Sequence, residues 1–393
     1  MAAPCIPDKL PLENLDWRAI LPLVGHANAC LARYDGMLQT LPNPSVLLSP
    51  ITANEAVLSS KIEGTQATLD EVLEAEAGLV TSEARRGDIE EITNYRIAVR
   101  NAEAALAERP LSLSMIKAVH QQLLQGVRGR DKTPGAFRED QNWIGRYGDP
   151  IEKARFIPPN PVVLKTELEA WENYIAREDE DPILQTAIAH AQFEILHPFK
   201  DGNGRIGRML IPLILYQRKA LSRPMFYMSE YLEGHRGEYY DRLLYVTDAG
   251  DWQGWITFFL NAMVVQAEAN LEKVRQIRDL YEETKRRVVE ITHSQFAMGA
   301  VDTLFSQPII SGSVFAQRSG FANRVTANNM LRTLEAEGII RRVREGSGRL
   351  PAIYALPNLI NIAEGRTVFA EAGGIPAQPE IEAAEVAPAD HAG

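Results

Sequence analysis

His197-Pro-Phe-Lys-Asp-Gly-Asn-Gly-Arg-Ile-Gly-Arg208 is the stretch of this 393-residue chain that decides the fold. The segments before it (182–196) and after it (205–218) carry apolar residues at helical spacing, which predicts a loop between two core helices. A loop that contains Gly202 and Gly204 and opens a helix presents unpaired backbone N–H groups and the positive end of the helix dipole. The pattern therefore indicates a site for an anion, most simply a phosphate.

The side chains of the same stretch carry the groups that phosphate chemistry uses. His197 is a candidate base, because imidazole titrates near neutral pH. Asp201 is a candidate ligand for a hard cation such as Mg²⁺. Arg205 and Arg208 are three residues apart, so one helix face is expected to aim both guanidinium groups at one polyanion.

The composition is that of an ordinary globular protein, with 45% apolar and 24% charged residues. A net charge of −11 argues against nucleic-acid binding by the whole surface, although a local basic patch stays open. The two cysteines, Cys5 and Cys30, have neither a disulfide framework nor metal-type spacing. The N-terminus does not resemble a signal peptide and no apolar run reaches membrane-spanning length, so we expect a soluble cytoplasmic protein without membrane contact.

The pattern along the chain predicts five regions and no sequence repeat. They are a helical N-terminal region (1–110), a catalytic domain (111–262), a helical linker (263–294), a separate module (295–358) and a disordered tail (359–393). Ala, Glu, Pro and Gly dominate the tail, which has few large apolar side chains, and this composition is typical of disorder.

Residues 197–208, here called the signature, resemble the Fic family motif His-Pro-Phe-x-Asp/Glu-Gly-Asn-Gly-Arg-x-x-Arg at every fixed position. The match joins rare residue types at fixed offsets in the required helical context, which makes it specific. The resemblance implies a mainly α fold: a Fic-type helical core with a small β-hairpin flap. A helical N-terminal region would precede this core, and a winged helix-turn-helix domain would follow it.

The resemblance also implies roles for single residues. His197 would be the catalytic base, Asp201 would hold Mg²⁺ on the ATP phosphates, and the backbone of 202–204, helped by the Asn203 side chain, would form an anion hole. The residues expected to bind ATP are Gly202, Asn203, Gly204, Arg205, Ile206, Gly207, Arg208, Tyr239 and Tyr240. Of the two tyrosines, one ring is expected to face the adenine and the other the core.

A second string, Ser59-Ser-Lys-Ile-Glu63-Gly64, lies at the end of a predicted helix that Gly64 would terminate. It resembles the Fic inhibitory motif Ser/Thr-x-x-x-Glu-Gly/Asn. In that family the glutamate pairs with the second arginine of the signature, here Arg208, which otherwise holds the γ-phosphate. Ser59, Glu63 and Gly64 are therefore expected to be inhibitory, and a carboxylate on Arg208 would neutralise it and repel phosphate.

Residues 135–161 depart from the helical pattern and are expected to form a short hairpin-like excursion, with a plain β-turn as the alternative. The stretch resembles the Fic flap, which docks a target segment as an added strand. The expected flap residues are Arg155, Phe156 and Ile157.

Residues 295–355 suggest two helices around a turn at Ser319-Gly320, followed by a two-stranded wing. This region holds seven arginines against four acidic residues and no lysine. That balance is compatible with DNA contact through the second helix and the wing. Winged helices also serve in protein interaction and dimerisation, so DNA and protein both stay open as partners.

These observations lead to a protein adenylyltransferase that moves AMP from ATP onto a Ser, Thr or Tyr hydroxyl of a protein, with Glu63 as an internal inhibitor of Arg208. Self-modification and a homodimer are compatible with this interpretation. Phosphoryl transfer is a weaker alternative, because Fic kinases replace Gly-Asn-Gly-Arg with a bulkier loop. Removal of AMP, with Glu63 orienting a water, is another. The competing class is a transcriptional regulator whose Fic core only senses nucleotide.

Overall fold

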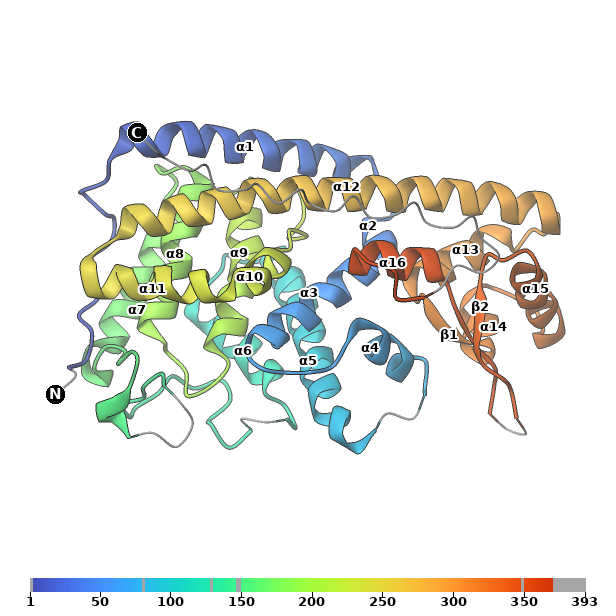
Figure 1. Ribbon diagram of the computed structural model, residues 1–393, viewed down its shortest axis with the longest axis horizontal. Helices are drawn as coiled ribbons and strands as arrows, with labels where there is room; N and C mark the ends of the chain where they lie inside the picture. The colour runs from blue at the N-terminus through green and yellow to red at the C-terminus, as the bar shows by residue number, and fades with distance from the viewer. Residues whose placement is uncertain (1–2, 80–81, 128–129, 146–149, 348–349, 370–393) are drawn as a thin grey trace, which may run out of the picture.

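A computed structural model describes residues 3–79, 82–127, 130–145, 150–347 and 350–369 of the chain. The described residues are mainly helical, with one small sheet, as the sequence predicts (Figure 1). The elements before the longest helix are α1 (Trp17–Thr40), α2 (Pro44–Leu47), α3 (Ser49–Ile62), α4 (Leu69–Glu76), α5 (Glu83–Leu106), α6 (Leu113–Leu123), the 3-10 turn η1 (Ile151–Lys153), α7 (Pro161–Ile175), α8 (Pro182–Leu196), α9 (Asn203–Gln217), α10 (Ser229–Gly234) and α11 (Arg236–Ala249). The remaining elements are α12 (Trp252–Thr292), α13 (Ala297–Ser306), β1 (Ile309–Ser311), α14 (Gly312–Arg318), α15 (Arg324–Ala336), β2 (Arg341–Arg344), β3 (Ile353–Ala355) and α16 (Pro357–Glu364).

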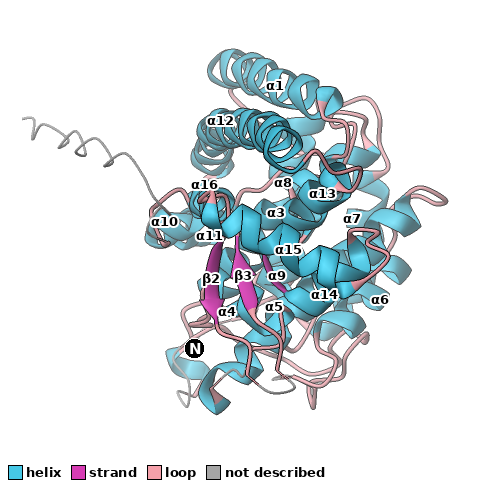
Figure 2. Ribbon diagram, turned by 90° about the vertical axis from the view of Figure 1, so that its right-hand side faces the viewer, coloured by secondary structure: helices cyan, strands magenta, loops and turns pink. Residues whose placement is uncertain are grey.

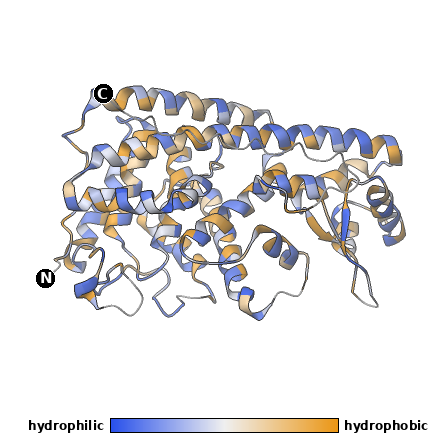
Figure 3. Cartoon of the chain, in the orientation of Figure 1, coloured by the Kyte–Doolittle hydropathy of each residue, from blue (hydrophilic) through white to orange (hydrophobic). Residues whose placement is uncertain are grey.

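Two long helices, α1 and α12, pack side by side and form a layer along one edge of the molecule (Figures 1 and 2). The carboxylates of Asp16 and Asp251 cap their N-termini by accepting backbone N–H groups. Because α12 is one continuous helix of 41 residues, the boundary expected at 262 between catalytic domain and linker falls inside a single element. Polar and apolar residues alternate along α12 (Figure 3), and no described helix is both long and apolar enough to cross a membrane.

The signature lies between α8 and α9, which pack against each other in the core. Pro182 stands in the first turn of α8 and Asp181 caps that turn, so this helix begins where the sequence predicts. Nearly every residue of α8 is buried, and the helix ends at His197 in the left-handed conformation. Gly202 also has a positive φ, of 78°, and opens α9. The prediction of a loop between two core helices is confirmed.

Helix α3 crosses beside α9 and packs against α5, α10 and α16. Ten of its fourteen residues are buried, so it is a core helix and not a surface arm. It ends at Glu63, and Gly64 follows with φ +103°, a conformation that favours glycine.

The segment predicted as a flap holds one β-bridge, between Ile144 and Phe156. The Ile144 N–H donates to the Phe156 carbonyl at 2.8 Å, and the Ile144 carbonyl accepts from the N–H groups of Arg155 and Phe156. The two arms of a hairpin-like excursion therefore meet here, although each contributes one bridging residue rather than a strand. Residues 146–149, between the arms, lie outside the described part.

The C-terminal module, residues 297–364, contains a helix-turn-helix pair, α14 and α15, followed by the hairpin β2–β3. Strand β1 pairs with β3 and completes a three-stranded antiparallel sheet of order β1-β3-β2, a strand that the sequence pattern did not indicate. The expectation of disorder from residue 359 is wrong for its first part. Pro357 opens α16, whose Leu359, Ile360 and Ala363 are buried, so enough apolar area is present to fold this turn of chain. Residues 370–393 lie outside the described part.

Candidate active site

His197 follows the last turn of α8, and its backbone conformation and hydrogen bonds fix its position. With φ 44° and ψ 59° it turns the chain out of the helix, and its carbonyl accepts a 2.9 Å hydrogen bond from Nε of Arg138. Its Nδ1 lies 3.3 Å from the Glu194 carbonyl, which can only accept, so Nδ1 carries the proton and Nε2 keeps the lone pair. Burial lowers the pKa of His197 to about 4, which leaves the ring neutral at pH 7 and able to accept a proton.

The loop after His197 is closed by side chains that leave little freedom. Asn203 bridges it, since its Oδ1 accepts from the Phe199 N–H and its Nδ2 donates to the Phe199 carbonyl, both at 2.8 Å. The Phe199 ring is fully buried and stacks on His120 with 3.7 Å between ring centroids. His120 accepts from the Gly135 N–H and therefore donates from Nε2 to the Asp201 carbonyl at 2.9 Å. The Asn203 side chain thus bridges the loop, and the help it was expected to give an anion hole stays a prediction.

Arg205 does not point where the sequence suggested. Its side chain is 1% exposed and forms a 3.0 Å ion pair with the buried Glu91 of α5, and its Nη2 lies 3.5 Å from Oδ1 of Asp201. The spacing of three residues sends Arg205 towards α5 and Arg208 towards α3, because α9 is packed on both of these helices. Asp201 keeps a third of its side-chain surface exposed, so it remains open to a cation.

Arg208 and the string 59–64 meet in space, although 145 residues separate Glu63 from Arg208. The guanidinium donates from Nη2 to Oε1 of Glu63 at 2.7 Å and to the Ser59 carbonyl at 2.8 Å, and from Nε to the Ser59 hydroxyl at 3.0 Å. Gly204 makes the approach possible, because a Cβ there would lie 2.2 Å from Oε1 of Glu63. The pairing expected between Glu63 and Arg208 is therefore present, and Ser59 of the same string contacts Arg208 as well.

Glu63 and Arg208 each stabilise the charged form of the other. Burial would raise the pKa of Glu63, but the Arg208 guanidinium outweighs burial and lowers it below its usual value. Burial likewise disfavours charged Arg208, and Glu63 more than offsets that cost and raises the pKa of the guanidinium. Nη1 of Arg208 is buried and has no hydrogen-bond partner among the described residues. The two N–H donors of Nη1 are thus left for an anion.

Glu194, on α8, is a further buried acid at the site that the sequence reading missed. A Cβ at Gly207 would lie 2.1 Å from its Oε1, so the carboxyl occupies the space that glycine leaves. Burial raises its pKa to about 8, although Arg208 opposes the shift. Glu194 is therefore largely protonated at neutral pH, although the charges of both Arg208 and Glu63 act on it. Only its position three residues before His197 could have drawn attention to it.

We expect Glu194→Gln to stabilise the fold at pH 7 by about 1–3 kcal/mol. An unfolded glutamate ionises near its usual pKa, whereas folding requires this one to take up a proton below pH 8. The cost of folding therefore grows as pH rises from about 4.5 to 8, and a neutral amide of the same shape avoids it. Urea unfolding at several pH values measures the difference. A stability gain that did not shrink as pH falls towards 4.5 would contradict a protonated Glu194.

The remaining predicted residues are placed as follows. Tyr239 is buried and its hydroxyl lies 2.9 Å from Nε2 of His190, whereas Tyr240 is half-buried, so the two rings differ in burial.

In the flap segment, Arg155 is exposed and pairs with Asp241 of α11. Ile157 is buried and its carbonyl accepts from the backbone N–H of Cys5 at 2.9 Å, so that main-chain acceptor is already used.

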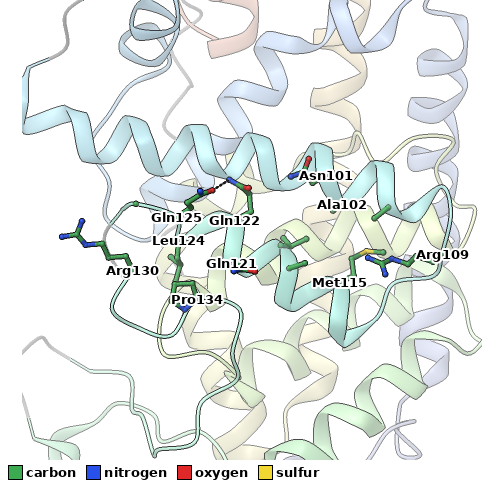
Figure 4. Close-up of a pocket in the computed structure, with 14 residues that line it drawn as sticks. Asn101, Ala102, Arg109, Met115, Gln121, Gln122, Leu124, Gln125, Arg130 and Pro134 are labelled. Atoms are coloured by element: carbon green, nitrogen blue, oxygen red, sulfur yellow. Dashed lines mark hydrogen bonds between the residues drawn. The ribbon is translucent and has the colours of Figure 1, made fainter.

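A sizeable cavity lies away from this site. It measures about 580 Å³ and lies between α5 and α6, with Arg109 and Arg130 near its ends and the amides of Gln121, Gln122 and Gln125 along it (Figure 4). None of the signature residues lines it. The side chain of Glu63 fills the space beside Gly204 of the signature.

Comparison with known proteins identifies two adjoining family segments. Residues 110–215 match the Fic/DOC family, and residues 21–104 match the Fic/DOC family N-terminal segment. A solved Fic family protein from Desulfovibrio desulfuricans aligns with a TM-score of 0.55 at 21% identity, over 90% of this chain and 98% of that one. A Fic domain containing signaling protein from Bacteroides thetaiotaomicron aligns with a TM-score of 0.51 at 15% identity, over 64% of this chain and 97% of that one. These two likenesses concern the fold.

Curated relatives have similar sequences over less than half of the chain. One from Aquifex aeolicus, named "Probable protein adenylyltransferase", is 29% identical over 181 residues, 44% of this chain and 51% of the relative. The "Protein adenylyltransferase Fic" of Aedes aegypti is 28% identical over 173 residues, 43% of this chain and 31% of the relative. The chain thus spans about half or less of the length of these relatives.

Proposed function

Since this chain is a member of the Fic/DOC family, we propose that it is a protein adenylyltransferase that transfers AMP from ATP to a Ser, Thr or Tyr hydroxyl of a protein. The observation that carries the proposal is the complete signature in its working context, with His197 at the end of α8 and Gly202 opening α9. The names of the relatives support it.

The reaction forms a bond between the hydroxyl oxygen and the α-phosphorus and breaks the bond from the α-phosphorus to the pyrophosphate oxygen. Nε2 of His197 takes the hydroxyl proton, since the neutral ring has its lone pair there. The backbone N–H groups at the start of α9 face the phosphates, at the positive end of the helix. Arg208 neutralises negative charge on the pyrophosphate that leaves. Arg205, paired with Glu91, acts by holding Asp201 and the loop in place.

Asp201 is the residue that would hold Mg²⁺. Its carboxylate is partly exposed at the loop, and Mg²⁺ binds through one or two carboxylates together with phosphates and waters, so the donor set fits. The bound ion would draw charge from the phosphates and orient them. His120 keeps the backbone of Asp201 fixed, while Arg205 limits the directions its side chain takes.

We expect Asp201→Asn to need at least about tenfold more Mg²⁺ for half-maximal AMP transfer, in the range that loss of a partner at a metal site costs. The amide keeps the size of the side chain but loses its charge. A Mg²⁺ titration of the transfer rate measures the shift, and Asp140→Asn, an exposed aspartate bound to Lys200, is the matched control. An unchanged Mg²⁺ requirement in Asp201→Asn would remove this residue from the metal site.

The experiment that tests the function is incubation with ATP labelled at the α- or the γ-phosphate. Protein-bound label from α-labelled ATP alone supports AMP transfer, whereas label from γ-labelled ATP would mean phosphoryl transfer. We include Glu63→Gly in the assay, because in wild type Glu63 occupies the arginine that the γ-phosphate needs. Absence of protein-bound label from both substrates in both forms would overturn the proposal.

A second candidate function, DNA contact by the C-terminal module, rests on the outer face of α15. Arg324, Asn328 and Arg332 are exposed and four residues apart, so they line one face of this helix. Arginine and asparagine are the side chains that most often read base edges. The wing is less suited, since Arg342 is paired with Glu335 and Glu345.

We expect the chain to retard random DNA duplex at low salt and to release it steeply as salt rises, if α15 contacts phosphates. Arg324→Ala with Arg332→Ala should weaken binding and flatten the salt dependence by about two charges. Fluorescence anisotropy of a labelled duplex measures both. Arg177→Ala, an exposed arginine before α8, is the control. No binding at low salt would exclude this second function.

A further inference from the structure

The seam between α1 and α12 brings together three side chains that bind transition metals. His26 and Cys30 are four residues apart on α1 and Glu268 faces them from α12, so that a ring nitrogen, the thiol sulfur and a carboxylate oxygen lie within 4.8 Å of one another. The two helices pack against each other along this seam (Figure 1). None of the three residues belongs to the signature or to the inhibitory motif.

The guanidinium of Arg33 already lies beside two of these side chains. Nη2 of Arg33 lies 3.0 Å from Sγ of Cys30 and 3.7 Å from Oε1 of Glu268. Arg33 and Glu268 are 58% and 59% exposed, so both side chains can rearrange, whereas Cys30 is 1% exposed and its sulfur has a fixed place. One fixed donor and two adjustable ones suit an ion that enters from solvent.

We propose that His26, Cys30 and Glu268 form a zinc site that staples α1 to α12. Nitrogen, sulfur and carboxylate oxygen are the donors that Zn²⁺ takes in proteins, and a water at the solvent side completes four-coordination. Binding releases the Cys30 proton to solvent, because the thiolate is the ligand, and moves the Arg33 guanidinium out into water. Spacing alone could not indicate this site, since its third ligand is on a helix more than two hundred residues away.

The test uses full-length, tag-free protein stripped with a chelator and titrated with zinc alone. We expect one zinc to bind per chain and the melting temperature to rise with zinc concentration. Cobalt in place of zinc should give a thiolate-to-metal absorption band, which reports the sulfur ligand directly. Cys30→Ser and Glu268→Gln should each weaken binding by at least the roughly 10–100-fold that even an outer partner is worth. Arg33→Ala should strengthen it, because the competing cation is gone.

The matched control is Cys5→Ser, which alters the other cysteine of the chain. It should leave zinc binding and the cobalt band unchanged. Glu268→Gln keeps the test sharp if Cys30→Ser folds poorly, because residue 268 is exposed. The proposal is overturned if the stripped protein binds no zinc, or if Cys5→Ser abolishes the cobalt band while Glu268→Gln binds zinc as tightly as wild type.

A separate observation concerns α3, the helix that carries Glu63. Nδ2 of Asn54 on α3 donates a buried 3.0 Å hydrogen bond to the Ala363 carbonyl of α16, and Nζ of Lys273 on α12 reaches the same carbonyl at 3.3 Å. Ile360 and Leu359 of α16 are fully buried. The C-terminal module therefore holds one half of α3 while Arg208 holds the other.

We infer that the C-terminal module sets the occupancy of the Glu63–Arg208 contact through α16. A partner that moves the module would loosen the N-terminal half of α3, and the same helix ends at Glu63. The effect on AMP transfer rests on the proposed function, but the loosening of α3 does not. Two-state coupling of this kind changes an equilibrium by about 2- to 30-fold.

The test compares Ile360→Ala with Leu331→Ala, an equally buried residue of α15 in the same module. Ile360→Ala should speed amide hydrogen exchange in 55–63 and raise AMP transfer about 2- to 30-fold. Leu331→Ala should do neither, and adding Glu63→Gly should remove the difference between the two. Unchanged exchange of α3 in Ile360→Ala would overturn the inference. Faster amide exchange of α3 in Ile360→Ala, with no AMP transfer by any variant, would support the coupling and contradict the proposed activity.

Discussion

Replacing His197 with alanine should lower AMP transfer by roughly 10²–10⁴-fold, the range that loss of a general base costs. The neutral ring has its lone pair on Nε2, because the Glu194 carbonyl binds the Nδ1 proton. Without that nitrogen the attacking hydroxyl keeps its proton until late in the reaction. Single-turnover transfer from α-labelled ATP measures the rate, and it should be compared in the Glu63→Gly background, where no carboxylate pairs with Arg208.

ATP affinity gives the control for this variant. The backbone of His197 accepts from Arg138, and alanine keeps that carbonyl, so the loop should retain its shape. We therefore expect nucleotide binding, followed by calorimetry, to change little while the rate falls. Transfer at an undiminished rate would show that another group takes the proton and would remove His197 from the role of base.

The fold around the site could be predicted because its signals are local. Asp181 and Pro182 mark the start of α8, apolar spacing marks its buried faces, and Gly202 marks the loop. The meeting of Glu63 with Arg208 was predicted through a family resemblance, since no local pattern links residues 145 apart. The sequence pattern does not show which side chains of two distant helices will contact each other.

The features that the sequence did not predict are contacts between residues that are far apart in the chain. Glu91 pairs with Arg205 across 114 residues, so the guanidinium that was expected to bind phosphate lies between Glu91 and Asp201. Arg138 lies in an irregular segment without periodicity, yet its guanidinium binds the carbonyls of His197, Pro159 and Leu196. Buried charged groups need partners, so these contacts follow once the packing is known, and not before.

Replacing Glu63 with glycine should raise AMP transfer by about 10–150-fold. The carboxylate accepts a 2.7 Å hydrogen bond from Nη2 of Arg208. A hydrogen bond to a charged group is worth about 1.5–3 kcal/mol, and ATP must overcome this free energy to reach Arg208 in wild type. Gly204 leaves just enough room for the carboxylate, so its removal also opens the space beside the loop. Initial rates with α-labelled ATP measure the release, and self-modification is expected to become visible.

Matched variants separate release of Arg208 from a general loosening of the helix end. Glu63→Gln keeps the size of the side chain and loses its charge, so it should release the site in part. Ser59→Ala removes only the hydroxyl that accepts from Nε of Arg208 and should release it less. Arg208→Ala should be inactive with either residue at position 63, because the γ-phosphate then has no guanidinium. Glu63→Gly with wild-type activity, and normal folding by circular dichroism, would make the contact structural and leave the enzyme without this inhibitor.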